Sequence, residues 1–414
     1  MQHEHSQKIA AQSKKSGNLV AGERHRGVDA RIWLLALGAF ATGTDAQVIS
    51  GILPRISADL SVSLDTAGGV VSVYSVTYAV SAPILAALTV HIRRDRAAVL
   101  ALAVFTIANA LCALAPTFAM LIGARILAGL SGGLFIPTAY ALAAGLAPPE
   151  RKGAALSVIA FGITGAIVAG VPLGILVGDG FGWHAAFWLV TGISAVALVG
   201  IAMLVPPPPA TPSAATLPQR FAPLAHAPTL LALLPTLLCL GLNGGVYTYL
   251  GAMLHERGYS TGITLAAFSL FGLGALTGSQ LGGRLADRYG PLRPMFIALA
   301  VSVIVGLLVP RALGALWSIG LVSFALGAAP WPIVLGQQQR LMALAPRHVE
   351  VVLALNNSFV YFGIAVGTAL GGWILARGFG LDAIATACAA FPVMALVSLL
   401  ASEGLSRVRG STGQ

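Results

Sequence analysis

The chain has 414 residues, of which 57% are hydrophobic and only 9% are charged, and its formal net charge is +10. A soluble protein of this length carries far more surface charge, so the composition excludes that class and indicates an integral membrane protein. The excess of basic residues is compatible with nucleic-acid binding, but their distribution follows a membrane topology instead.

A polar and basic arm over residues 1–31 comes first. It has no apolar stretch followed by small residues, so we do not expect a cleaved signal peptide. Twelve apolar segments follow, each close to the roughly twenty residues that a membrane-spanning helix needs. We predict these spans at 32–53, 69–90, 97–116, 119–145, 154–178, 185–205, 229–253, 263–283, 294–310, 314–339, 351–376 and 383–402.

The lysines and arginines fall mostly on one side of this arrangement. With the N-terminal arm inside, only four of the 24 lie in outer loops, namely Arg55, Arg257, Arg311 and Arg377. An excess of basic residues in short loops marks the cytoplasmic side. We therefore predict a multi-pass protein of a bacterial inner (plasma) membrane, with both termini in the cytoplasm and no nucleic-acid partner.

The first span contains Asp45, whereas the other acidic residues fall in tails, loops or span ends. An ionisable group at membrane depth is costly and is by default a candidate functional residue. Arg125, in the fourth span, is the one basic residue inside a predicted span. At 1.5 Å per residue, Asp45 lies roughly 12 Å and Arg125 roughly 9 Å from the outer end of its span. We expect the two side chains to pair.

A buried acid–base pair of this kind has two interpretations. A carboxyl group gains proton affinity in an apolar pocket and loses it beside a cation, so a movable pair can take up and release a proton. On this hypothesis Asp45 carries the proton and Arg125 modulates its affinity. The alternative is a static pair that fixes helix register, because breaking such a pair destabilises a protein even when it has no role in transport.

The chain divides into two similar halves. A Pro- and Ala-rich linker over 206–228 separates a predicted six-helix bundle at 32–205 from another at 229–402, and a tail at 403–414 follows. Asp95-Arg96, after the second span, recurs 192 residues later as Asp287-Arg288, after the eighth. Parallel repeats are typical of transporters that bind substrate at the midplane between the halves.

A row of glycines is repeated in the same way. Gly170, Gly174 and Gly178 in the fifth span recur 193 residues later as Gly363, Gly367 and Gly371 in the eleventh. Glycine at every fourth position allows close helix packing. The alternative interpretation is that spans five and eleven lie at the interface between the halves, where close packing would let them rock. Pro172 removes one backbone donor and is expected to loosen the fifth span.

Polar and aromatic residues at mid-membrane depth are candidates for lining a substrate cavity. An apolar pocket with a few polar contacts suits small, neutral amphipathic molecules, and no second buried carboxylate is available for strongly cationic ones. Packing or interface anchoring is the alternative for each Tyr and Trp. The candidates are Tyr78, Asn109, Asn243, Tyr247, Trp331, Asn356, Asn357 and Tyr361. The three cysteines lack metal-ligand spacing, so we predict no metal site and no cofactor.

Several motifs resemble those of the major facilitator superfamily, in particular its twelve-span drug:proton antiporter branch and the arabinose-efflux-like and chloramphenicol-resistance-like group within it. They are GTDAQVISGILPRISADLSVS in and after span one, ARILAGLSGG with the PPERKGAAL loop, GITGAIVAGVPLGILVGDGFGWHAAFW in span five and GGRLADRYGPLR after span eight. The resemblance implies an all-α fold of twelve transmembrane helices in two pseudo-symmetric six-helix bundles. It also implies that spans one and four are neighbours and that Arg125 takes part in proton coupling.

The same resemblance assigns gating roles to two further groups of residues. In the loop signature these are Gly283, Asp287, Arg288 and Gly290, and in the fifth span they are Gly170, Pro172 and Gly174. It implies that Asp287 caps a neighbouring helix or pairs with arginines when the inner side is closed; a solvated charge cluster is the alternative. The first-half copy, TVHIRRDRAAV, lacks the flanking glycines, so its gating role is not predicted.

Together these features predict a transporter rather than an enzyme. We expect a monomeric exporter of drug-like, sugar-like or other small neutral amphipathic molecules, driven by proton antiport with alternating access. The alternative is a facilitator or importer of sugars or metabolites with the same fold. A membrane sensor is more distant, because the short soluble segments leave no room for a signalling domain. An intramembrane enzyme would need a second buried acid, a buried His pair or a Ser–Lys arrangement, which the spans lack.

Overall fold

The computed structural model describes residues 29–89, 91–206, 227–345 and 349–412. Every regular element in this described part is helical, and twelve helical segments are long and apolar enough to cross a membrane. Each predicted span overlaps one of them, so the prediction of an all-α membrane fold with twelve spans is confirmed. The basic arm up to residue 28 and most of the linker, 207–226, lie outside the described residues.

The helices follow one another along the chain with short connections. In the first half they are α2 (Ala30–Asp59), α3 (Leu64–Leu88), α4 (Arg94–Ala113), α5 (Phe118–Leu146), the 3-10 turn η1 (Pro149–Arg151), α6 (Lys152–Gly165), the π-helical η2 (Ala166–Gly170), α7 (Val171–Phe181) and α8 (Trp183–Leu204). In the second half they are α10 (Ala227–Glu256), α11 (Thr261–Tyr289), α12 (Leu292–Ala312), α13 (Leu316–Ala328), α14 (Pro330–Leu344), α15 (Val349–Ala376), α16 (Leu381–Cys388) and α17 (Ala390–Thr412). Helix α17 thus continues into the predicted tail.

Three spans are interrupted next to a proline, which cannot donate a backbone hydrogen bond. In the fifth span the π-helical η2 lies directly before Pro172, where the sequence predicts a loosened helix. The tenth span is divided at Ala329 into α13 and α14, and the twelfth at Ala389 into α16 and α17. Pro330 and Pro392 lie just after these two breaks.

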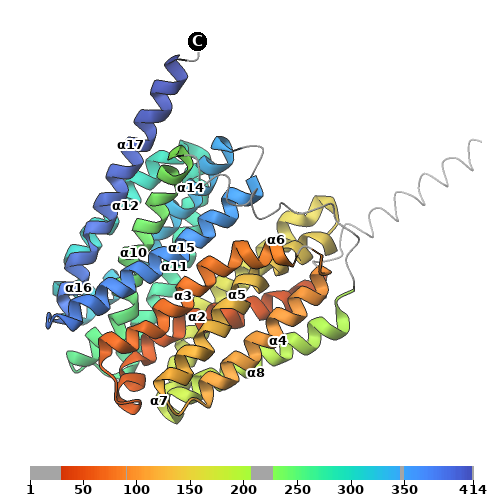
Figure 1. Ribbon diagram of the computed structural model, residues 1–414. Coiled ribbons are helices and arrows are strands. Elements are labelled where there is room, and N and C mark those ends of the chain that lie inside the picture. The colour runs from red at the N-terminus through yellow and green to blue at the C-terminus, as the bar shows by residue number, and fades with distance from the viewer. Residues whose placement is uncertain (1–28, 90, 207–226, 346–348, 413–414) are drawn as a thin grey trace, which may run out of the picture.

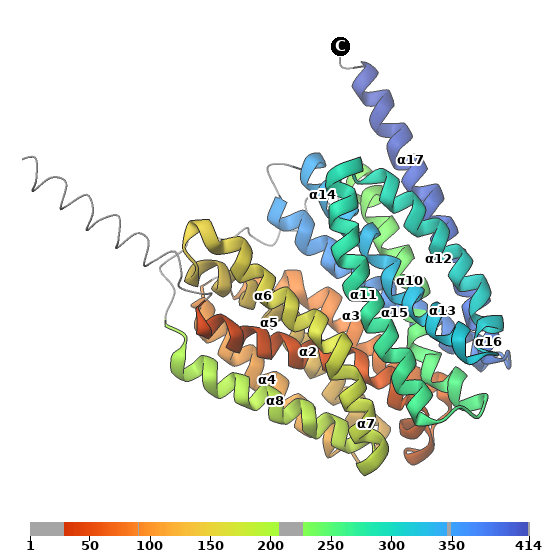
Figure 2. The same ribbon diagram turned by 180° about the vertical axis from the view of Figure 1, so that it is seen from behind.

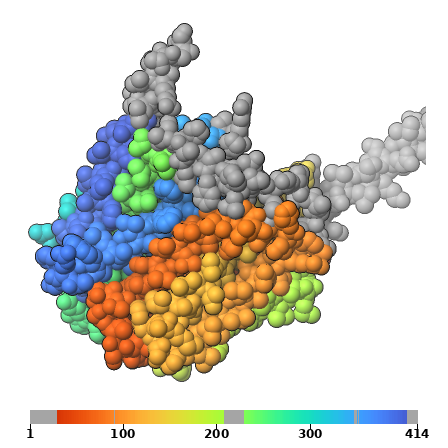
Figure 3. Space-filling model, viewed as in Figure 1, coloured from red at the N-terminus to blue at the C-terminus, as the bar shows by residue number. Residues whose placement is uncertain are grey.

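The first six spans form one bundle and the last six form another (Figure 1). The two bundles meet through α3 against α15, α2 against α10, and η2 and α7 against α11, as the view from behind also shows (Figure 2). In the space-filling view the orange surface of α3 lies directly beside the blue surface of the second half (Figure 3). The second and eleventh spans therefore form a large part of the contact between the halves.

Glycines bring the backbones of the two halves into close contact near one end of the bundle. This end carries the connection 60–63, which the charge distribution predicts to be extracellular, and we call it the predicted outer end. A Cβ atom on Gly251 of α10 would lie 2.6 Å from the Ser50 carbonyl oxygen of α2. One on Gly372 of α15 would lie 3.1 Å from the Asp65 carbonyl oxygen of α3. The halves are therefore closely packed at this end.

The repeated glycine rows face helices of their own half. Gly170 and Gly174 pack on Thr44 and Val48 of α2, and Gly363 and Gly367 pack on backbone carbonyls of α10. The glycine rows therefore serve packing within a half, because each row faces the first helix of its own bundle. The fifth and eleventh spans themselves do lie at the interface between the halves, as the alternative interpretation places them, but they contact the other half through other residues. That close packing lets them rock stays a prediction.

An arginine near the predicted outer end ties each bundle together internally. Arg55 of α2 forms an ion pair with Asp179 of α7 and also donates to the Gly178 carbonyl at 3.1 Å. Arg257, just after α10, pairs with Asp382 of α16 at 2.5 Å. Because both pairs are exposed in part, each adds little to the free energy of unfolding. They fix which helices are neighbours within a half.

Candidate functional site

Asp45 of α2 and Arg125 of α5 form a direct ion pair inside the first bundle. The Arg125 Nη1 atom donates to Asp45 Oδ1 at 2.6 Å, and neither side chain is exposed at all. Asp45 is the only acidic side chain that is fully buried in the described part of the chain. The expected contact between the two residues is present, because spans one and four pack together at the depth of both side chains.

A glycine allows α5 to approach α3 closely beside this pair. A Cβ on Gly129, one turn after Arg125, would lie 2.7 Å from the Tyr74 carbonyl oxygen of α3. Thr42 and Thr44, which come just before Asp45 in α2, turn their hydroxyls back to carbonyls of their own helix. The site therefore lies among closely packed helices, and the Thr42 and Thr44 hydroxyls are satisfied within α2.

Tyr74 is a functional candidate that the sequence did not single out. The Arg125 guanidinium carbon lies 4.2 Å from the centre of the Tyr74 ring, within the range of a cation–π contact. The Tyr74 hydroxyl has no hydrogen-bond partner among the described residues. The signal for Tyr74 in the sequence was its position four residues before Tyr78, which places both rings on one face of a helix.

Parts of the pair keep unused hydrogen-bonding capacity. Asp45 Oδ2 and the Nε and Nη2 atoms of Arg125 are buried and have no partner among the described residues. Buried polar atoms normally have a hydrogen-bond partner, so an atom without one is a candidate for a functional role. A carboxylate with one paired and one unpaired oxygen is able to accept a proton on the unpaired oxygen without first breaking the ion pair.

An aromatic cluster connects this pair to the other half of the molecule. Tyr78 of α3 stacks on Tyr361 of α15 with ring centres 3.7 Å apart, and Tyr74 lies 6.4 Å from Tyr361. The Asn357 amide lies 3.5 Å from the Tyr78 hydroxyl. Three predicted cavity residues, Tyr78, Asn357 and Tyr361, therefore meet at the interface between the halves, and Tyr74 links them to Arg125.

The other predicted cavity residues lie apart from this cluster. Asn109 donates to the Phe105 carbonyl of its own helix at 3.1 Å. Asn356 accepts a hydrogen bond from Thr236 at 2.8 Å, which joins α15 to α10. Tyr247 packs on two phenylalanine rings of α11, with its hydroxyl unpartnered among the described residues. For these three residues the structure favours packing within a bundle.

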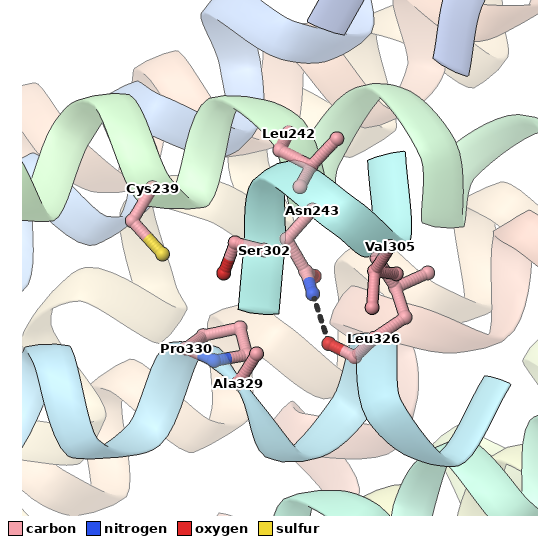
Figure 4. A pocket seen from close by; sticks show the side chains of 8 residues that line it. All are labelled: Cys239, Leu242, Asn243, Ser302, Val305, Leu326, Ala329 and Pro330. Carbon is pink, nitrogen blue, oxygen red and sulfur yellow. Dashed lines mark hydrogen bonds between the residues drawn. The ribbon is translucent and has the colours of Figure 1, made fainter. Parts of the chain in front are cut away.

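Asn243 and Trp331 lie beside the break in the tenth span. The Asn243 amide nitrogen donates to the Leu326 carbonyl at 3.1 Å (Figure 4). Asn243 lines a crevice between α10, α12 and the tenth span that is too narrow for a small molecule. Trp331 follows Pro330 directly and is partly exposed. Neither residue joins the tyrosine cluster in this conformation.

The loop signature after the eighth span has a specific backbone conformation. Gly290 ends α11 with φ of 77°, a left-handed value that favours glycine over other residues. Asp287 accepts a hydrogen bond from Gln339 of α14 at 3.1 Å, and Arg288 lies over the Tyr289 ring. Asp287 is absent from the ion pairs found among the described residues. The gating roles of Asp287, Arg288 and Gly283 stay predictions.

Comparison with known proteins gives consistent matches over most of the chain. A sequence model of the Major Facilitator Superfamily matches residues 35–368. The inner membrane transport protein YdhP of Escherichia coli K12 is 31% identical, over 84% of this chain and 89% of its own length. A chloramphenicol resistance protein of Streptomyces lividans is 32% identical, over 72% of this chain and 78% of its own.

A more distant relative and a solved structure extend these matches. A probable sugar efflux transporter of Pasteurella multocida is 28% identical, over 89% of this chain and 91% of its own. The crystal structure of a bacterial homologue of the human lysosomal transporter Spinster, inward-facing and occupied, superimposes with a TM-score of 0.70. It covers 90% of this chain and 96% of its own, at 18% sequence identity.

Proposed function

We propose that this chain, which belongs to the Major Facilitator Superfamily, exports small molecules in exchange for protons. Membership in this family makes it a membrane transporter and not an enzyme. The observation that carries the rest of the proposal is the fully buried Asp45–Arg125 pair with its unpaired Asp45 Oδ2. A buried carboxylate of this kind is suited to bind and release a proton as its surroundings change.

The position of the pair explains how a proton would influence the whole molecule. Protonation of Asp45 removes its attraction for Arg125, whose guanidinium also lies over Tyr74. Tyr74 lies near Tyr361 of the other half, and Tyr361 stacks on Tyr78. A change of charge at Asp45 therefore reaches the interface between the halves through directly neighbouring side chains, and the interface is what alternating access rearranges.

Export is favoured over import by the character of the relatives. Two of the similar proteins are described as a chloramphenicol resistance protein and a probable sugar efflux transporter. The tyrosines and Asn357 at the interface offer aromatic faces and an amide, which suit neutral amphipathic molecules. The substrate we propose is therefore a small neutral compound, drug-like or sugar-like. We propose that the protein acts as a monomer and needs no cofactor.

The test starts from cells that express the chain and are screened for resistance to a panel of antibacterial compounds and sugars. A compound found in this way is then offered to everted membrane vesicles with an imposed pH gradient. We expect gradient-driven uptake that stops when nigericin collapses the gradient. Asp45→Asn should insert normally and show no gradient-driven uptake, while Glu150→Gln, an exposed control, should behave as wild type.

Two results would change the proposal. Gradient-driven uptake by Asp45→Asn at the wild-type rate would remove Asp45 from proton coupling. If uptake by the wild-type protein is unchanged when nigericin collapses the pH gradient, the protein is a facilitator, the alternative with the same fold.

A further inference from the structure

The tenth span is broken by prolines that leave backbone carbonyls without their helical donors. In an α-helix the carbonyl of residue i accepts from the backbone nitrogen of residue i+4. Pro330 and Pro332 have no such donor, so the carbonyls of Leu326 and Ala328 lose their regular bonds. Helix α13 ends at Ala328 and α14 begins at Pro330. A buried carbonyl without a partner is costly within a membrane.

A side chain from another helix replaces the first of these bonds. The Asn243 amide nitrogen, from α10, donates to the Leu326 carbonyl at 3.1 Å, and Asn243 is only 7% exposed (Figure 4). The geometry is that of an ordinary amide–carbonyl hydrogen bond. Asn243 therefore supplies the donor that Pro330 lacks.

The second carbonyl, that of Ala328, lies close to a glycine of another neighbouring helix. A Cβ on Gly278 of α11 would lie 2.2 Å from the Ala328 carbonyl oxygen. Only glycine lets the α11 backbone approach this carbonyl so closely. Asn243 of α10 thus donates to one of the two proline-freed carbonyls, and the backbone of α11 lies close to the other at Gly278.

A second bond of the same kind occurs in the described part of the chain, at a helix that is not broken. Pro235 removes the donor for the Leu231 carbonyl of α10, and the Ser398 hydroxyl of α17 donates to that carbonyl at 3.3 Å. Helix α10 nevertheless runs without interruption from Ala227 to Glu256. The Ser398 bond therefore provides a matched comparison for the Asn243 bond.

We propose that Asn243 is a positioning residue for transport, whose amide fixes the end of α13 to α10 at the Pro330 break and releases it when the tenth span bends. The inner segment, α14, carries Gln339, which binds Asp287 of the loop signature. Bending at the break would therefore displace Gln339 and change its hydrogen bond to Asp287. This role does not depend on the substrate, on the direction of transport or on the proton, so it goes beyond the proposed function.

Cys239 provides a native probe for the state of the break. It is 1% exposed and lines the same crevice as Asn243, Ala329 and Pro330 (Figure 4). The wild-type protein and its variants in membranes are treated with N-ethylmaleimide, and the labelling of each cysteine is followed by mass spectrometry of peptides. Cys112 and Cys388, both buried elsewhere, are internal controls.

In Asn243→Leu, which keeps the side-chain size but cannot donate, we expect Cys239 labelling to rise roughly two- to tenfold, the shift that one hydrogen bond produces. Adding Pro330→Ala restores the backbone donor to Leu326, so labelling in the double variant should return to the wild-type rate. Ser398→Ala should leave Cys239 protected.

Three results would overturn the proposal. The first is unchanged Cys239 labelling in Asn243→Leu. The second is labelling that stays raised after Pro330→Ala is added. The third is an equal rise at all three cysteines, which indicates general loosening of the protein rather than opening of the break.

Discussion

Arg125 uses two parts of one side chain at the candidate site. Its Nη1 atom pairs with Asp45, and its guanidinium plane lies over the Tyr74 ring. A buried charge is tolerated only when it is paired and hydrogen-bonded, so each partner keeps the other stable within the bundle. Stability and proton coupling must therefore be separated by experiment at this site.

Removing Arg125 alone should destabilise the protein. Arg125→Leu leaves the Asp45 carboxylate buried without a counter-charge, which costs about 3–5 kcal/mol. Asp45→Leu combined with Arg125→Leu should recover most of the lost stability and still show no gradient-driven transport. Thermal unfolding of the purified variants in detergent measures the first effect, and vesicle uptake measures the second. A double variant that transports normally would contradict any role for the pair in coupling.

Substitutions of Tyr74 should separate its ring from its hydroxyl. Tyr74→Phe keeps a ring beneath the guanidinium and should retain wild-type stability. Tyr74→Leu loses the cation–π contact and should lower the free energy of unfolding by about 1–2 kcal/mol. The melting temperatures of the two variants, compared with wild type, show whether the ring or the hydroxyl stabilises the protein. Equal losses in the two variants would assign the effect to the hydroxyl instead.

The pairing of Asp45 with Arg125 could be predicted from the sequence, because depth in a membrane follows directly from position along a helix. Tyr74 could not, because a mid-span tyrosine has the same pattern whether it packs in the core or lies under a cation. What distinguishes it is the close approach of α5 at Gly129, a tertiary contact that spacing alone does not reveal.

Among the helices, the glycine rows set the distance between the first helix of each bundle and its partner. Gly367 of α15 is the tightest example, since a Cβ there would lie 1.9 Å from the Gly241 carbonyl oxygen of α10. The neighbouring atom is backbone, which cannot move aside as a flexible side chain can. The rows therefore hold helices within a half at a fixed spacing.

A methyl group at Gly367 should be poorly tolerated. Gly367→Ala forces α15 away from α10 and should cost about 1–3 kcal/mol through overpacking. Gly192→Ala in α8 is the matched control, because nothing lies within 4 Å of its Cβ position. That control should be neutral or stabilise by up to about 1 kcal/mol. Comparable thermal stability of the two variants would refute this account of the glycine row.

The sequence predicts all twelve spans because long apolar segments are the strongest pattern a membrane protein has. The breaks at Ala329 and Ala389 were not predicted, although prolines follow both. Other prolines, such as Pro137 in α5, leave their helices continuous. Whether a proline breaks a helix depends on which neighbours satisfy the freed carbonyl, and those neighbours are set by the tertiary fold.

At the scale of the whole molecule, the structure is closed at the predicted outer end. Backbones of the two halves touch at Gly251 with Ser50 and at Gly372 with Asp65. Tyr249 of α10 also lies against Gly68 of α3. In alternating access these contacts must separate, because the same substrate site has to open to the other side.

Enlarging Gly251 should push the halves apart at this end. Cysteines at Asp65 and Gly372 report the closed state, since oxidation joins them only when their backbones are close. Adding Gly251→Leu to this pair should lower the cross-link yield. Gly69→Leu is the control, because its Cβ position has nothing within 4 Å. An undiminished yield with Gly251→Leu would show that this contact does not govern closure.

That Asp45 is the single fully buried carboxylate in the described part of the chain would also limit how much work proton coupling can do. If Asp45 is the one carrier, each cycle moves one proton, and a charge crossing 100 mV yields about 2.3 kcal/mol. For a neutral cargo this energy sustains a concentration ratio of about 50-fold across the membrane, since tenfold corresponds to about 1.36 kcal/mol. A chain with one such residue is therefore suited to keeping an unwanted compound at a low internal level, not to building up a large store of it.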